Sequence, residues 1–430
     1  MKLYRLYASA SAILLIASPV VHGVDFTVQA VVLEGDEVPG VGLITSIDNI
    51  AVNNNGQWLV EADTDNPDTN ADSVLLMDGV LILREGDPLS APEGATLGSF
   101  DSVTLNGRGN RGHNFFLDGT SGTDDDSGVF WNDELIFQEG DEAPLFTPGT
   151  PFVGFFDVKI NGDNDLLVTA SVDDPNIESS VDRALYLVKL NSTGRVLDVR
   201  LVVAEGDILP GQTEAVADIG TGPHATAFNS LHPNDDVLFF ADLSGDTTRD
   251  GVIYMQDSYN LDYILIAQEG DPSPVTGRSW SSLSSPRLDL TNWRCYVFSG
   301  TLDGDTDTNL LLVKNGGKFR QEGDTMEAID GVALTSFGSG PLEINSPRVE
   351  VLWYGKWNNP DTTMDEGLFL DDTLLIQEGV TILEGSPVDT IRGVEDGYHM
   401  SEVGDYIIAE LVLSDGREGA FLMTRDPPPP

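Results

Sequence analysis

The tripeptide Glu-Gly-Asp recurs along this chain and limits its possible folds more than any other feature. Each copy closes a short apolar run, and successive glutamates lie 51, 54, 66, 64, 53 and 56 residues apart. The glutamates are Glu34, Glu85, Glu139, Glu205, Glu269, Glu322 and Glu378, and the last copy carries a valine in place of the aspartate. Self-similarity at such a period is typical of a repeat architecture.

Each repeat has the pattern of four antiparallel strands. In the first unit, apolar alternation and turn residues predict strands at 46–52, 58–62, 73–77 and 80–84. The run Asn53–Gly56 and the pair Asp78-Gly79 are typical of tight turns between strands. Second and third strands of the later units are expected at 115–117, 128–131, 166–171, 184–190, 237–243, 251–255, 295–300, 309–313, 349–355, 367–370, 406–413 and 419–423.

The two ends of the repeat region complement each other. The last unit has three strands, and the segment 26–33 resembles the fourth strand that this unit lacks. Pairing of 26–33 with 419–423 would close a ring and remove the open sheet edges, whereas a linear stack of sheets would leave both edges bare. The sequence therefore predicts an all-β fold, a seven-bladed β-propeller of four-stranded antiparallel blades.

The terminal segments predict export. Residues 1–23 have the basic start, the short apolar stretch and the small residues of a signal peptide, so we expect a mature start near Val24. We expect one propeller domain at 24–426, a Pro-rich tail at 427–430, and no transmembrane segment after signal removal. The expected location is secreted, cell-surface or periplasmic. Cys295 is the single cysteine, which excludes an internal disulfide.

The net charge of −49 limits the partners. Phosphate binding needs clustered Lys and Arg, so we expect no nucleic-acid partner. A charge of this size attracts cations and keeps a protein in solution. We expect a monomer whose partner is an unidentified protein or glycan.

Strand order sorts the acidic loops onto one face. With strands A to D in each blade, the D-to-A turns and B-to-C loops lie at one end of the ring, and the A-to-B and C-to-D turns at the other. The Glu-Gly-Asp copies are D-to-A turns. The acidic B-to-C segments are 63–72, 118–126, 173–182, 242–250, 303–307 and 361–366.

These acidic features have a structural and a functional interpretation. In the Glu-Gly-Asp turns, glycine permits positive φ and aspartate can bond its own turn; alternatively, the seven glutamates bind cations or a basic partner. In the B-to-C loops, alternating oxygen ligands suggest Ca²⁺ as a cofactor, and solvated turns are the alternative. The candidate calcium ligands are Asp303, Asp305 and Asp307, and the looser set Asp63, Asp65 and Asp68.

Signals for catalysis are few. The chain has no nucleophile elbow, zinc-binding His-Glu-x-x-His or phosphate loop, so we assign no catalytic residue. His224 and His399 fall in or near inner strands and, with Arg287 and Glu343, could form a polar channel site. Trp357 could stack on a sugar, although core packing is the usual role of an aromatic residue.

The repeats resemble those of the secreted bacterial choice-of-anchor tandem-repeat proteins with an NxxGxxxxF motif. Asn53-x-x-Gly56 and Asn106-x-x-Gly109 match the first half of that motif, while its phenylalanine is absent at Glu61 and displaced to Phe115. The resemblance implies export and a repeat fold, and it brings no catalytic residues.

Two functions remain open. The first is a non-enzymatic, extracytoplasmic binding or scaffold propeller, stabilised by calcium through acidic loops on one face. The alternative is an extracytoplasmic hydrolase or lyase acting on carbohydrate at the channel mouth. The enzyme interpretation expects a pocket on the Glu-Gly-Asp face in which His, Arg and carboxylate groups converge.

Overall fold

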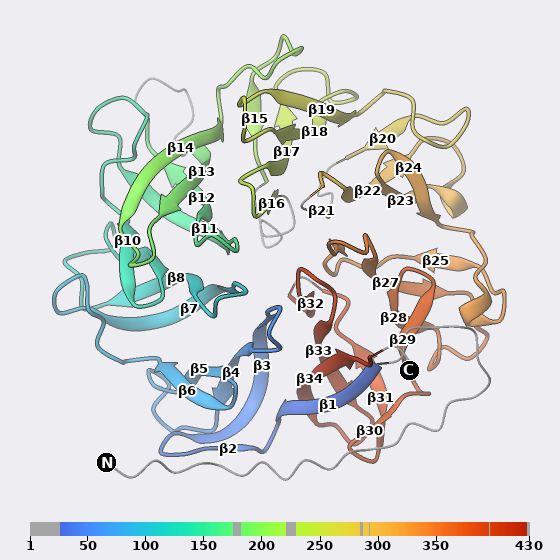
Figure 1. Ribbon diagram of the computed structural model, residues 1–430, viewed down its shortest axis with the longest axis horizontal. Helices are drawn as coiled ribbons and strands as arrows, with labels where there is room; N and C mark the ends of the chain where they lie inside the picture. Colours follow the sequence, from blue (N-terminus) through green and yellow to red (C-terminus); the bar gives the residue numbers. More distant parts are fainter. Residues whose placement is uncertain are drawn as a thin grey trace.

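Seven antiparallel sheets surround a central axis in a computed structural model of the chain (Figure 1). The structure describes residues 26–174, 182–220, 229–283, 287–291, 293–394 and 396–427. Within these residues the regular structure is β-strand, apart from two single-turn 3₁₀ helices, η2 (Thr306–Thr308) and η3 (Glu327–Ile329). The predicted seven-bladed propeller is confirmed.

Blades 1 to 3 have long, continuous inner strands. Blade 1 contains β2 (Glu37–Val38), β3 (Gly42–Val52), β4 (Trp58–Thr64), β5 (Ser73–Met77) and β6 (Val80–Arg84). Blade 2 contains β7 (Thr96–Leu105), β8 (Arg111–Asp118), β9 (Ser127–Trp131) and β10 (Glu134–Gln138). Blade 3 contains β11 (Phe152–Ile160), β12 (Leu166–Val172), β13 (Asp182–Leu190) and β14 (Val196–Ala204).

In blades 4 to 6, as in blade 7, the inner strand is split into two segments that pair with the same second strand. Blade 4 contains β15 (Val216–Asp218), β16 (Asn229–Leu231), β17 (Val237–Leu243), β18 (Gly251–Gln256) and β19 (Tyr263–Gln268). Blade 5 contains β20 (Trp280–Ser282), β21 (Leu288–Leu290), β22 (Tyr296–Leu302), β23 (Leu310–Lys314) and β24 (Gly317–Gln321). Blade 6 contains β25 (Leu334–Ser336), β26 (Glu343–Ile344), β27 (Val351–Trp357), β28 (Glu366–Leu370) and β29 (Thr373–Gln377).

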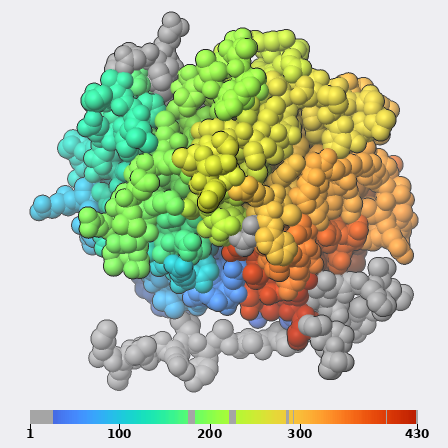
Figure 2. All heavy atoms as spheres, turned by 45° about the horizontal axis from the view of Figure 1, so that its top comes forward, coloured from blue at the N-terminus to red at the C-terminus, as the bar shows by residue number. Residues whose placement is uncertain are grey.

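Blade 7 joins the two ends of the chain. It contains β30 (Ile382–Leu383), β31 (Ser386–Ile391), β32 (Tyr398–Met400), β33 (Tyr406–Leu413), β34 (Glu418–Arg425) and β1 (Phe26–Leu33). Strand β1 pairs antiparallel with β34, from Phe26 opposite Arg425 to Leu33 opposite Gly419. The first and last blades therefore abut, as Figure 2 shows where blue meets red. The predicted ring closure is confirmed.

The core lies between neighbouring blades. Strand side chains alternate between the two faces of a blade, and both faces are covered. Leu59 and Leu75 of blade 1 pack with Leu97 and Phe115 of blade 2. The next residue along each strand faces the opposite side of the blade. Val60, which follows Leu59, packs with Ile408 of blade 7. Because each blade needs two neighbours, ring closure removes the last exposed apolar face.

The Glu-Gly-Asp turns fasten each blade to the next. In the turn at Gly35, the glycine N–H donates to the Ile44 carbonyl at 2.9 Å, and the Ile44 N–H donates to the Asp36 carbonyl at 2.9 Å. Oδ2 of Asp36 also accepts the Leu33 N–H at 2.9 Å. The same backbone pair recurs at the next five turns, with partners Leu97, Phe152, Val216, Trp280 and Leu334. Gly35 has φ +89°, which favours glycine.

Candidate functional site: a polar pocket in the central channel

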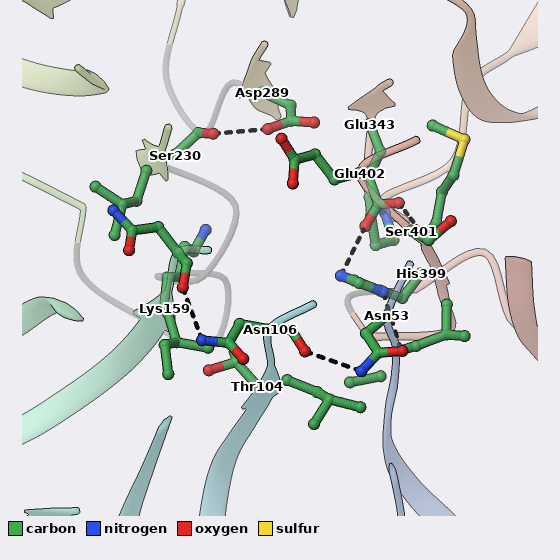
Figure 3. A pocket seen from close by; sticks show the side chains of 18 of the residues that line it. Asn53, Thr104, Asn106, Lys159, Ser230, Asp289, Glu343, His399, Ser401 and Glu402 are labelled. Carbon is green, nitrogen blue, oxygen red and sulfur yellow. Dashed lines mark hydrogen bonds and ion pairs between the residues drawn. The ribbon is translucent and has the colours of Figure 1, made fainter. Parts of the chain in front are cut away.

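One pocket of about 280 Å³ occupies the central channel, and inner-strand residues of all seven blades line it (Figure 3). The lining residues come from the second half of each inner strand and from the A-to-B turn that follows, for example 49–54 in blade 1 and 287–291 in blade 5. The pocket therefore lies towards the A-to-B end of the ring. The enzyme interpretation expected a pocket on the Glu-Gly-Asp face; this pocket lies at the opposite end, where the inner strands present their polar side chains.

The inner wall of the pocket uses one equivalent position in each blade. This position lies two residues before the side chain that caps the A-to-B turn by accepting a backbone N–H. Around the ring it is occupied by Ala51, Thr104, Lys159, Ser230, Asp289, Glu343 and His399. The five positions from blade 3 to blade 7 carry a cation, a hydroxyl, two carboxyls and an imidazole, and Thr104 of blade 2 adds a second hydroxyl.

Asp289 is held by donors from three blades. Its Oδ1 accepts the Ser230 hydroxyl of blade 4 at 2.6 Å and the Leu290 N–H of its own strand at 2.7 Å. Its Oδ2 accepts the Ile344 N–H of blade 6 at 2.8 Å. Burial raises the pKa of Asp289, and the Ser230 hydrogen bond opposes that shift. The side chain is thus fixed, with both oxygens already engaged.

Glu343 keeps one oxygen directed at the pocket. Its Oε2 accepts the Met400 N–H, and its Oε1 lies 4.0 Å from Nε2 of His399 (Figure 3). Burial raises the pKa of Glu343 well above its ordinary value, and the charge of Asp289 adds to the shift. Glu343 is therefore a carboxyl group that holds its proton at pH values where an exposed glutamate has lost it.

His399 is fixed as a neutral hydrogen-bond donor. Its Nδ1 accepts the Val52 N–H of blade 1 at 3.2 Å, which places the proton of the neutral ring on Nε2. Burial, followed by the nearby positive charge of Lys159, lowers the pKa of His399 to about 4. The Nε2–H is therefore available to a ligand across the neutral range.

Lys159 supplies the single ammonium group of the ring of equivalent positions. Its Nζ donates to the Asn229 carbonyl of blade 4 at 2.5 Å and lies 3.8 Å from Oδ2 of Asp157. Figure 3 shows it across the channel from His399, with Asp289 and Glu343 on the opposite wall. A ligand in the pocket would meet an ammonium group on one side and the paired imidazole and carboxyl groups of His399 and Glu343 on the other.

The sequence-predicted channel residues have mixed outcomes. His399 lines the pocket as expected, and His224 lies outside the described residues. Arg287 also lines the pocket, but one of its guanidinium nitrogens donates to the carbonyls of Phe337 at 2.8 Å and Gly340 at 3.1 Å. Trp357 is 2% exposed, so the suggestion that it stacks on a sugar was wrong; it packs at an edge-to-face angle against Phe369.

The predicted glutamates lie one in each blade, at the opposite end from the pocket. They are Glu34, Glu85, Glu139, Glu205, Glu269, Glu322 and Glu378. Several face acidic residues of their own B-to-C loop, as strand order predicted: Glu85 faces Asp72, and Glu139 faces Asp126. Burial and these neighbours raise the pKa of Glu85 and of Glu139 to about 7.

The predicted calcium ligands make local hydrogen bonds. Asp65 accepts the Leu43 N–H at 2.7 Å, Asp305 caps η2 through the Asp307 N–H at 3.1 Å, and Asp303 accepts the Ser279 N–H at 3.1 Å. Asp63 accepts the Ser46 hydroxyl, and Asp68 accepts the Asn70 N–H. Among the described residues, the group whose three ligand atoms lie within 4.8 Å of one another is instead Asp365, Glu366 and Glu378.

Sequence reasoning missed Lys159, Ser230 and Asp289. A signal for them existed, because each lies two residues before a turn-capping residue, in register with His399 and Glu343. Finding it requires aligning the repeats on their A-to-B turns. The Glu-Gly-Asp copies do not supply that alignment, because the spacing from the glutamate to this position varies from 17 residues at Ala51 to 25 residues at Ser230.

The fold and the pocket define a seven-bladed β-propeller with a polar site in its channel. A family of unknown function, DUF7453, matches residues 27–259, more than half of the chain, and the protein belongs to that family. The match to the choice-of-anchor repeat proteins remains a resemblance. No curated protein matches the chain.

Several solved structures are similar to this chain at low sequence identity. A mutant of puromycin hydrolase complexed with PGG is 12% identical, with a TM-score of 0.43 over 89% of this chain and 51% of that chain. The chain thus spans about half the length of that protein. An α-L-arabinofuranosidase from Fusarium graminearum, in complex with an iminosugar inhibitor, is 9% identical, with a TM-score of 0.33 over 93% of this chain and 98% of that chain. The α-L-arabinanase of Penicillium chrysogenum complexed with arabinobiose is 11% identical, with a TM-score of 0.32 over the same two shares.

The described part of the chain contains no helix of the length and apolar character needed to cross a membrane.

Proposed function

We propose that this protein is a non-enzymatic, extracytoplasmic binding propeller that holds a small polar ligand in its channel. The observation that carries the proposal is the convergence of Lys159, Ser230, Asp289, Glu343 and His399, from five consecutive blades, on one pocket of about 280 Å³. A concave site with a few convergent polar groups is the usual form of a small-molecule site. Binding is preferred over catalysis because both oxygens of Asp289 are already engaged by three donors.

A thermal-shift screen tests this proposal on the mature chain, residues 24–430. The compounds are monosaccharides, amino acids and small amines, and we expect at least one class to raise Tm in proportion to ln of its concentration. Glu343→Gln should weaken that ligand at least about tenfold, the effect of losing roughly one hydrogen bond to a charged or polar partner. Glu134→Gln, an exposed glutamate on β10, is the matched control and should change nothing. A hit unaffected by channel substitutions would overturn the proposal.

A second candidate is hydrolysis of a glycosidic bond in the same pocket. It is favoured by one observation, a carboxyl kept protonated, Glu343, beside a second carboxyl, Asp289. Glu343 would donate its proton to the leaving oxygen, while Asp289 would take a proton from the attacking water. Release of reducing ends from a panel of neutral oligosaccharides should then fall at least about a hundredfold in Glu343→Gln. Binding without any turnover in the wild type would exclude this candidate.

We also propose that Ca²⁺ stabilises the propeller on the Glu-Gly-Asp face. Support comes from the three carboxylates Asp365, Glu366 and Glu378, because oxygen ligands are those Ca²⁺ prefers. Adding millimolar CaCl₂ to chelator-treated protein at low ionic strength should raise Tm, and an equal ionic strength of NaCl should raise it less. Equal shifts for the two salts would indicate screening alone.

A further inference from the structure

Trp293 differs from every other tryptophan in the chain. It is 65% exposed, whereas Trp58, Trp131, Trp280, Trp353 and Trp357 are each 8% exposed or less. Exposing a large aromatic ring to water forfeits the burial that stabilises the other five, so an exposed tryptophan is informative where it borders a pocket.

The Trp293 turn forms the rim of the channel pocket. Thr291, two residues earlier, lines the pocket and accepts the Trp293 N–H at 3.3 Å on its hydroxyl. Asp289, which carries the engaged carboxylate of the site, lies two residues before Thr291 on β21. The indole is thus attached at the A-to-B end of the channel, directly above the blade 5 contribution to the site.

A second exposed aromatic lies next to this turn. Arg294 bridges the turn to blade 4, with Nε 2.9 Å from Oδ2 of Asp236 and one terminal nitrogen 2.8 Å from Oδ1 of Asp257. The same Oδ1 of Asp257 accepts the N–H of Tyr259 at 2.8 Å. Tyr259 is 95% exposed. Tyr259 belongs to the turn between β18 and β19, the two outer strands of blade 4, so it lies at the same end of the ring as Trp293 but farther out from the channel.

Arg294 anchors the turns of blades 4 and 5 to each other. The bidentate arrangement of Arg294 fixes the backbone of both turns, while the two rings project from them into solvent. Fixing the backbone lowers the entropic cost of placing a ring against a ligand. Two exposed aromatic side chains on anchored turns thus lie at the end of the ring where the polar cavity opens.

We infer that the ligand is a carbohydrate chain, with a terminal sugar in the channel and the following sugars stacked on Trp293 and Tyr259. This inference rests on the proposed binding function of the channel. Sugar rings present apolar C–H faces to aromatic rings and hydroxyl edges to hydrogen-bonding groups, and this site offers both. The net charge of −49 opposes an acidic polysaccharide, so the chain is neutral or carries amino sugars.

Because Trp293 is the exposed tryptophan, its fluorescence can report the binding of a ligand to this end of the ring. Acrylamide, a neutral quencher, reaches exposed indoles, so its effect on the fluorescence of the mature chain is dominated by Trp293. We expect neutral and amino-sugar oligosaccharides of three or more units to protect this fluorescence, and the matching monosaccharides to leave it quenched. Trp293→Ala should weaken oligosaccharide binding about tenfold and leave monosaccharide binding unchanged.

Two further variants complete the test. Tyr259→Ala should produce a smaller loss for the same oligosaccharides, and Phe116→Ala, an aromatic 47% exposed on β8, is the control that should produce none. Oligosaccharide binding with unprotected Trp293 and an unchanged Trp293→Ala affinity would overturn the stacking inference and leave the proposed function standing. Failure of every sugar, with an amino acid or amine bound in the channel, would overturn the carbohydrate assignment alone. If no class of compound binds, both proposals fail.

Discussion

Glu61 is a buried carboxyl with no cation against it. It is 6% exposed, the Asn49 amide donates to it at 2.5 Å, and burial raises its pKa to about 8. Because the folded pKa exceeds the unfolded value of 4.5, the native state binds the extra proton, and the associated stability is lost as pH rises towards 8.

We therefore predict that Glu61→Gln is more stable than the wild type at alkaline pH. The gain in free energy of unfolding should be on the order of 1–2 kcal/mol at pH 8 and close to zero at pH 5, because glutamine needs no proton to be neutral. Chemical denaturation at the two pH values measures it. The exposed-site variant Glu134→Gln should show no pH-dependent difference, and a loss of stability at pH 8 in Glu61→Gln would contradict the assignment.

Individual residues show which parts of the channel site could be predicted from the sequence. His399 was expected in the channel because a histidine near an inner strand is rare enough to stand out. Lys159 and Asp289 did not stand out, because the chain is rich in charged residues and only the register of the inner strands separates channel positions from solvated ones. Trp293 and Trp357 were indistinguishable by pattern, since both lie beside strand ends.

The A-to-B turn is the element that links local sequence to ring assembly. Oδ1 of Asn106 accepts the N–H groups of Arg108 and Asn110, both at 3.0 Å, and so closes its own turn. Its Nδ2 donates to the Asn161 carbonyl of the next blade at 2.9 Å. Asn53 and Asn161 repeat this arrangement, with donor distances of 2.9 and 3.3 Å to the following blade. The Asn-x-x-Gly motif is thus an inter-blade contact as well as a turn.

We predict that Asn106→Ala lowers the free energy of unfolding by roughly 2–3 kcal/mol, because it leaves buried backbone groups of two blades without partners. Asn191→Ala is the matched control. Asn191 accepts the N–H groups of Thr193 and Arg195 in an exposed turn at 2.8 and 3.1 Å, so its loss should cost roughly 1 kcal/mol or less. Equal costs in urea denaturation would show that the inter-blade bond contributes nothing.

The strands themselves were predictable because every repeat carries its own turn residues. The interruption of the inner strands in blades 4 to 6 was not, because β15 and β16 read as one irregular segment when their shared partner β17 is unknown. The pairing of two short segments with one strand depends on the tertiary structure and cannot be seen in the local sequence. The Glu-Gly-Asp turns are the conspicuous motif of the sequence, whereas the pocket is built at the other end of the inner strands, by positions that share no motif.

Closure of the ring depends on one strand. Removing residues 1–33 deletes β1 and leaves β34 as an open edge in blade 7. We predict that the shortened chain associates or unfolds at a markedly lower temperature than the mature chain, because an exposed edge recruits other chains. Removal of 427–430 is the control and should leave Tm and elution volume unchanged. Size-exclusion chromatography with light scattering provides the measurement, and a stable monomer without β1 would contradict the closure.

The excess of acidic side chains sets the response of the whole molecule to pH. The carboxyl groups of Glu85, Glu139 and Glu378 have pKa values of about 7, raised first by burial and then by acidic neighbours. All three are raised above the unfolded value, so their contribution to stability is complete below about pH 4.5 and is lost as pH rises through 7.

We predict that Tm falls between pH 5 and pH 8 at low ionic strength, and that added salt reduces the fall because it screens the repulsion. Calorimetry at the two pH values, with and without 1 M NaCl, measures both effects. A Tm that rises towards pH 8 would show that these groups do not control the stability of the ring.

The pairing of β1 with β34 also fixes the order in which the blades can be completed during synthesis. Thr27 contacts Asp426, which lies 399 positions further along the chain, so β1 acquires its partner only after the hairpin of β33 and β34 has been synthesised. Contacts between such distant segments form slowly, because a very large loop has to close first. Blades 2 to 6 can form while synthesis continues, but the ring stays open until β34 is available to pair with β1.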